Sequence, residues 1–194
     1  MGIKPIKLQG SWDEGFALDI HTFSSTLIGE DEYGHKRFDT VRSEMGELIY
    51  QFKNKNRYEK LSEIIALARP FVESWEALET VVTVLPAPST KTRSYQPAQE
   101  IAKRIAEIIG AYYVDNVLNK QGSVQSKDLS AAEKSQLKGT IQKKKSATRE
   151  HSVLIIDDLY ESGGTLNDCV RVLRTDKNIK YIYVLAMTKT RTSR

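Results

Sequence analysis

The chain has 194 residues, which is enough for one domain with a substantial hydrophobic core. Hydrophobic residues make up 40% of it and charged residues 28%, as in globular proteins that fold in water. No apolar run approaches the roughly 20 residues that cross a bilayer, so the sequence predicts no association with a membrane.

Charge and cysteine content narrow the class of protein further. The net charge of +4 suits a polyphosphate ligand and tolerates nucleic acid without deciding between them. The single cysteine, Cys169, cannot form an internal disulfide, and one cysteine with three histidines offers no zinc-binding spacing. Because residues 1–10 lack the apolar core of a signal peptide, we expect a cytoplasmic protein.

Residues 1–75 predict a hairpin followed by two helices. Residues 16–25 and 33–42 are expected to pair around the turn-rich segment Gly29–Gly34. Apolar residues then recur at spacings of three, four and seven, which predicts helices over 43–54 and 59–75.

Strands and helices alternate in the rest of the chain. A run of apolar residues predicts a strand at Val81–Leu85, and a helix over 97–109 opens with a proline and is ended by a glycine. Ala111–Val114 and Tyr181–Ala186 predict two further strands. The polar stretch 119–150 has two interpretations, a flexible loop that closes over a ligand or a charged segment without order.

This alternation predicts an α/β fold with a parallel central sheet flanked by helices and an N-terminal extension of hairpin and helices. We expect one domain over 1–194, with the extension in 1–75 and the ligand-binding core in 76–194. Ligands of such sheets bind beyond the carboxyl ends of the strands.

The most informative pattern of the chain is 153–165. Four branched apolar residues, Val153–Ile156, predict a strand covered on both faces, and two acids, Asp157 and Asp158, follow it. The loop Ser162–Thr165 can then expose backbone N–H groups at the start of a helix, where a phosphate binds well. Two acids beside a phosphate are favourable only if the ligand also offers hydroxyls or a metal.

A second loop, residues 89–96, carries chemistry suited to a pyrophosphate. Ser89 offers a hydroxyl, Lys91 a point charge, and Arg93 a guanidinium that binds oxyanions with two hydrogen bonds. Taken alone, the loop is better explained as a solvated basic turn. Together with the pattern at 153–165, it favours a phosphate ligand.

Residues 153–165 resemble the phosphoribosyl pyrophosphate (PRPP) signature of type I phosphoribosyltransferases. That signature has four apolar residues, two acids, two apolar residues, a small or acidic residue, Ser or Thr, Gly, any residue, and Ser or Thr. Tyr160 and Glu161 depart from it. Residues 40–186 are similar in layout to the ComF-like branch of this superfamily, including an early helix that ends in a lysine, Lys53.

The resemblance implies an Mg²⁺-dependent transfer of the 5-phosphoribosyl group of PRPP to a nitrogenous acceptor, with release of pyrophosphate. Asp157 and Asp158 would contact the ribose hydroxyls directly or through the metal. The 5′-phosphate would be bound by Ser162, Gly163, Gly164 and Thr165. The pyrophosphate would be bound by Ser89, Lys91 and Arg93.

Glu161 has two interpretations of equal weight. In the purine branch of the family an aspartate at this position takes a proton from the base, so Glu161 is a candidate general base. Otherwise it is a glutamate that faces solvent.

Two other classes of function stay open. The chain is also consistent with a non-catalytic PRPP- or nucleotide-binding module that acts as a sensor or as an accessory factor in DNA uptake or nucleic-acid handling. Basic residues in Lys53–Arg57 and Lys138–Arg149 are consistent with direct nucleic-acid binding. A homodimer is compatible with every one of these functions, and residues 1–40 have no assigned role.

Overall fold

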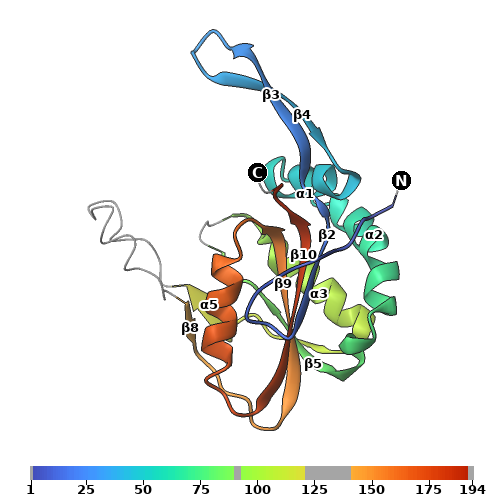
Figure 1. The fold of residues 1–194 in the computed structure, drawn as a ribbon, viewed down its shortest axis with the longest axis vertical. Coiled ribbons are helices and arrows are strands. Elements are labelled where there is room, and N and C mark those ends of the chain that lie inside the picture. The colour runs from blue at the N-terminus through green and yellow to red at the C-terminus, as the bar shows by residue number, and fades with distance from the viewer. Residues whose placement is uncertain (1, 90–92, 121–140, 192–194) are drawn as a thin grey trace, which may run out of the picture.

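The computed structural model describes residues 2–89, 93–120 and 141–191. Its centre is a six-stranded sheet (Figure 1). From one edge to the other the strands are β1 (Ile6–Lys7), β2 (Glu14–Ile20), β10 (Ile179–Lys189), β9 (His151–Tyr160), β5 (Val81–Pro86) and β6 (Tyr112–Tyr113). β1 runs antiparallel to β2, and every other pair is parallel. The sheet is therefore mixed and mostly parallel, which confirms the predicted fold class.

Helices cover both faces of the sheet and create two hydrophobic cores. On one face lie α1 (Glu44–Asn54), α2 (Lys60–Ser74) and α3 (Pro97–Ile109), and on the other lies α5 (Gly164–Leu173). Strand β9 divides its side chains between the cores, because successive residues of a strand point to opposite faces. Leu154 and Ile156 pack with the first three helices, whereas Val153 and Ile155 pack with α5.

The helices predicted over 43–54, 59–75 and 97–109 are confirmed, and their ends have clear local causes. The Ser43 hydroxyl caps α1 by accepting a hydrogen bond of 2.9 Å from the Gly46 backbone N–H. Pro97 stands in the first turn of α3, and Gly110 ends that helix with a left-handed φ of 68°. A short 3-10 helix, η1 (Glu76–Thr80), then leads from α2 into β5.

The strand predicted over 16–25 is wrong in its bounds and in its pairing. Residues 14–20 form β2 inside the central sheet, and β3 (Thr22–Glu30) begins two residues later and pairs with β4 (Lys36–Arg42). The extension at 1–75 thus supplies two strands of the central sheet. Ala17 and Leu18 are fully buried, which explains why the polar alternation of a surface hairpin is missing there.

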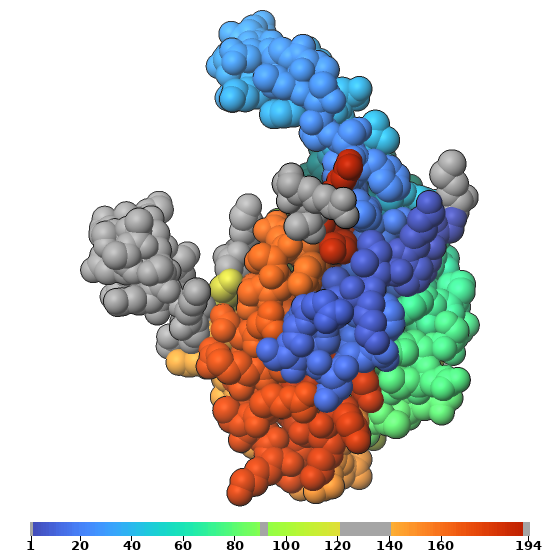
Figure 2. Space-filling view, in the orientation of Figure 1, coloured from blue at the N-terminus to red at the C-terminus, as the bar shows by residue number. Residues whose placement is uncertain are grey.

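Strands β3 and β4 form an arm that stands clear of the rest of the molecule (Figure 2). The arm leaves the end of β2 and returns at the start of α1 (Figure 1). The Arg191 guanidinium fixes its base by donating a hydrogen bond of 2.6 Å to the Phe23 carbonyl.

At the start of the polar stretch 119–150, β7 (Leu118–Lys120) pairs as an antiparallel strand with β8 (Ile141–Lys143). Residues 121–140, the centre of the predicted flexible loop, lie outside the described residues. Among the residues that are described, no helix is both long and apolar enough to cross a membrane.

Candidate functional site

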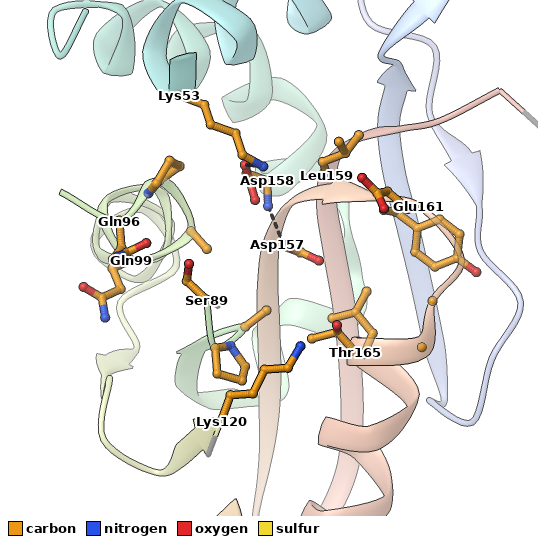
Figure 3. Close-up of a pocket in the computed structure, with 18 of the residues that line it drawn as sticks. Lys53, Ser89, Gln96, Gln99, Lys120, Asp157, Asp158, Leu159, Glu161 and Thr165 are labelled. Atoms are coloured by element: carbon orange, nitrogen blue, oxygen red, sulfur yellow. Dashed lines mark hydrogen bonds and ion pairs between the residues drawn. The ribbon is translucent and has the colours of Figure 1, made fainter. Parts of the chain in front are cut away.

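A cavity of about 420 Å³ opens at the carboxyl ends of β5 and β9. Its wall contains the whole segment 157–166 and, from the loop after β5, Ser89 and Arg93. Lys53 of α1 and Lys120 of β7 approach the cavity from opposite sides (Figure 3). The two loops that the sequence singled out therefore meet in one site.

The two aspartates of the cavity have different neighbours. Continuing the alternation of β9, Asp157 follows the face of α5 and Asp158 the face of α1. The Asp158 carboxylate forms an ion pair with the Lys53 ammonium, with 2.6 Å between Oδ2 and Nζ (Figure 3). Lys53 lies in the last turn of α1, so this contact ties the helix end to the floor of the cavity.

Burial and the neighbouring Asp158 carboxylate raise the pKa of Asp157 to about 7, against a weaker opposing effect of Lys53. The Asp157 carboxylate also accepts a hydrogen bond of 2.9 Å from the Asp158 backbone N–H. A half-buried carboxyl with a raised pKa beside a second acid is typical of a binding site for a cation or a hydroxyl-bearing ligand.

The loop before α5 is shaped for an anion. Gly163 has a φ of 76°, and a Cβ at this position would lie 2.7 Å from the Tyr160 hydroxyl, so only glycine fits. No side chain caps α5, and its first backbone hydrogen bond runs from the Asn167 N–H to the Gly163 carbonyl. The N–H groups of residues 164–166 therefore have no partner within the helix, and these three residues line the cavity.

The N-terminal segment braces this loop from outside the cavity. Asn167 donates a hydrogen bond of 3.0 Å to the Gly163 carbonyl, while its amide oxygen accepts bonds of 3.0 Å from the backbone N–H and the hydroxyl of Ser11. The ring of Trp12 packs edge-on against Tyr160 with centroids 6.3 Å apart. Residues 1–40 thus have a structural role, which the sequence did not reveal.

The structure gathers most of the predicted site residues. Asp157, Asp158, Glu161 and the loop 162–165 line the cavity together with Ser89 and Arg93. Lys91 lies outside the described residues. Glu161 is exposed, and its backbone carbonyl accepts a hydrogen bond of 3.2 Å from the Thr190 hydroxyl. The binding and catalytic roles of these residues stay predictions.

Two cations of the cavity were missed as site residues. The sequence marks Lys53 as the lysine that ends an early helix and as part of a basic segment, and the first of these was the available signal. Lys120 lies in a polar stretch with no apolar pattern, so the neighbouring sequence gives no indication that it lines a site.

The donor set of the cavity fits an Mg²⁺ ion shared with a substrate. In the described part of the chain, no group of three or more His, Cys, Asp or Glu side chains is arranged to hold a metal. Mg²⁺ typically binds one or two carboxylates and completes its shell with water and substrate phosphates. Asp157 and Asp158 could supply that share, with the remaining oxygens from the ligand.

The fold and the site define a class of protein that comparison with known families makes explicit. Residues 59–189 match the model of the phosphoribosyl transferase domain, so the chain belongs to that family. The match includes both cavity loops and leaves out the N-terminal strands and the arm. No curated protein matches the chain in sequence.

Solved structures with a similar fold include two purine phosphoribosyltransferases. A hypoxanthine phosphoribosyltransferase from Staphylococcus aureus is 17% identical with a TM-score of 0.40, and the match covers 66% of this chain but only 62% of that protein. An adenine phosphoribosyl transferase from Trypanosoma brucei, solved with AMP, pyrophosphate and ribose-5-phosphate, is 10% identical with a TM-score of 0.47. That match covers 96% of this chain and 74% of that protein. The resemblance to the ComF-like branch stays a prediction.

Proposed function

We propose that the chain is an Mg²⁺-dependent phosphoribosyltransferase, which moves the 5-phosphoribosyl group of PRPP to a nitrogenous acceptor and releases pyrophosphate. The observation that carries this proposal is the meeting of two acids, an uncapped helix N-terminus and the Arg93 loop around one cavity. A ligand that fits all three must combine hydroxyls with two separate anionic groups. Membership of the phosphoribosyl transferase domain family supports the same substrate class.

The 5′-phosphate would bind at the start of α5. Backbone N–H groups of residues 164–166 and the hydroxyls of Ser162 and Thr165 offer hydrogen bonds there, and the helix dipole favours negative charge. The brace from Ser11 and Asn167 holds this loop before the ligand arrives, which lowers the entropy cost of binding.

The ribose hydroxyls would lie against Asp157 and Asp158. Lys53 already neutralises part of the Asp158 charge, so Asp158 can accept a hydroxyl hydrogen bond without strong repulsion of the phosphates. Desolvation disfavours the charged form of Asp157 and raises its pKa. A nearby cation would therefore stabilise this carboxylate more than that of Asp158.

The leaving pyrophosphate would lie between the two loops. Arg93 can stabilise the charge that grows on it as the bond to C1 of the ribose breaks, and Ser89 can donate a hydrogen bond. Mg²⁺ held by the acids and the substrate would neutralise the same oxygens and orient them. Lys91 is also proposed to bind the pyrophosphate, and this part of the proposal rests only on its position in the sequence.

Glu161 is proposed as the general base for the nitrogen nucleophile. Its carboxylate lines the cavity beside the phosphate loop and is exposed enough to meet an incoming acceptor (Figure 3). Such a base contributes roughly 10²–10⁴-fold in rate.

The direct test of the function is release of pyrophosphate from PRPP by the full chain, measured with Mg²⁺ and a panel of purines, pyrimidines and amines. The proposal predicts release that depends on one acceptor and on Mg²⁺, and that Asp158→Asn abolishes. Binding of PRPP without turnover on any acceptor would instead favour the sensor or accessory-module function.

A further inference from the structure

Lys120 is a cation of the candidate site to which the proposed function gives no task. The described wall of the cavity contains three cationic side chains, Lys53, Arg93 and Lys120. Lys53 is paired with Asp158, and Arg93 belongs to the loop proposed for the pyrophosphate. Among the described carboxylates, none forms an ion pair with the Lys120 ammonium. Its charge is therefore available to a ligand.

The pairing of β7 with β8 directs the Lys120 side chain toward α5. Lys120 lies opposite Ile141 in this antiparallel pair, and residues directly opposite each other point to the same face. Leu118, two residues earlier in β7, shares that face. Leu118 and Ile141 are both buried in the core that contains Leu166 of α5. The half-buried Lys120 thus extends from this core toward the start of the helix.

Two observations bring the Lys120 ammonium to the first turns of α5. Figure 3 shows the side chain reaching from β7 toward Thr165, on the opposite side of the cavity from Lys53. The charge also acts on Cys169, one helical turn after Thr165. Burial raises the pKa of the Cys169 thiol, and the Lys120 ammonium opposes that rise. A full positive charge therefore lies near the uncapped end of the helix.

We propose that Lys120 binds the 5′-phosphate of PRPP together with the backbone N–H groups at the start of α5. This inference rests on the proposed function and adds a residue to it. The helix end supplies only partial charges, and the nearby acids repel a phosphate. A lysine ammonium supplies a point charge and a charge-assisted hydrogen bond to a phosphate oxygen.

Two partial ligands separate the 5′-phosphate from the leaving group. Ribose-5-phosphate carries the first without the second, and pyrophosphate with Mg²⁺ represents the second alone. Calorimetric titration of the full chain measures both dissociation constants. In Lys120→Gln the constant for ribose-5-phosphate should rise by about tenfold or more, because a charge-assisted hydrogen bond is lost. The constant for pyrophosphate should change by less than about threefold.

Three further variants separate charge from packing. Lys120→Met keeps an apolar stem without the charge, so it should weaken ribose-5-phosphate as Lys120→Gln does. Lys120→Arg keeps the charge and should stay within about threefold of the wild type. Lys144→Gln removes the same charge from an exposed residue that follows β8 and lies outside the cavity wall, and it should leave both constants unchanged. Circular dichroism checks that each variant folds. If Lys120→Gln does not, Lys120→Met takes its place.

Unchanged binding of ribose-5-phosphate by the uncharged variants would overturn the inference. Equal weakening of both ligands, or weakening of pyrophosphate alone, would also overturn it, because the lysine would then attract anions in general or serve the leaving group. The same holds if the wild type binds PRPP but not ribose-5-phosphate. In these cases the proposed function survives, since PRPP still binds the wild type. A folded wild type that binds neither PRPP nor ribose-5-phosphate would overturn both.

Discussion

At the scale of single residues, the two aspartates of the cavity differ in their electrostatic surroundings. Asp158 shares its charge with Lys53 before any ligand binds, whereas burial raises the pKa of Asp157. A ligand therefore meets one acid that is already compensated and one that gains from a cation. This inequality is what would let two adjacent carboxylates stand beside the proposed phosphate-binding loop.

Glu161 gives the sharpest test of chemistry at this scale. Glu161→Gln keeps the size and hydrogen bonding of the side chain but removes the base, so we expect turnover to fall roughly 100-fold or more with PRPP affinity unchanged. Steady-state kinetics with the acceptor that supports pyrophosphate release measures it. Glu150→Gln, at an exposed glutamate paired with Lys180, is the control.

Unchanged turnover in Glu161→Gln, together with abolished turnover in Asp158→Asn, would contradict the base role. Glu161 would then be the exposed glutamate of the alternative interpretation.

The place of the acids and the glycine loop at one cavity could be predicted from the sequence because strand, acids and glycines are contiguous in 153–165. The contact of Lys53 with Asp158 could not, since it joins residues more than a hundred positions apart and depends on how α1 packs on the sheet. Contacts of this kind are decided by tertiary packing and leave no local pattern.

At the scale of elements, a buried aspartate ties three segments together away from the cavity. Asp176 accepts hydrogen bonds of 2.8 Å from the Lys143 ammonium, 2.9 Å from the Ala147 N–H and 3.2 Å from the Asn178 N–H. These bonds join the end of β8 and the segment that follows it to the turn between α5 and β10. The Lys143 ammonium, followed by the Ala147 N–H, lowers the pKa of Asp176.

We therefore expect Asp176→Asn to lower the free energy of unfolding by about 2 kcal/mol at neutral pH, because buried donors lose a charged acceptor. Urea unfolding measures this loss. Asp168→Asn, which removes an ion pair to Arg171 at the surface, should change the free energy by less than about 0.5 kcal/mol.

The pH dependence of this contribution has a definite sign. The folded pKa of Asp176 is depressed, so its stabilisation is present above the unfolded pKa of about 4 and is lost as the pH falls through the folded value. The difference between wild type and Asp176→Asn should thus shrink as the pH drops below about 4. A difference that stays constant with pH would contradict the charged role of Asp176.

The predicted hairpin shows where elements could not be read from sequence. Residues 14–30 contain two strands, and the break at His21 carries neither glycine nor proline to announce it. What separates them is the pairing of β2 with β10, in which both faces of β2 become buried. The turn at 31–35 was predictable, because Asp31 and Gly34 are typical turn residues.

At the scale of the whole molecule, the parallel sheet and its helix layers could be predicted because strands and helices alternate with clear periodicity from residue 43 onward. The place of β1 and β2 at one edge could not, since sheet order depends on long-range pairing. The N-terminal segment completes the sheet, braces the loop before α5 through Ser11 and provides the arm.

The central claim is that this cavity binds PRPP with Mg²⁺, and calorimetric titration of the full chain tests it most directly. We predict Mg²⁺-dependent binding of PRPP to the wild type and to the surface variant Asp168→Asn. We predict no binding to the folded Asp157→Asn/Asp158→Asn double variant. Failure of the folded wild type to bind PRPP would contradict the account and would point to nucleotides, nucleic acids or protein partners as ligands.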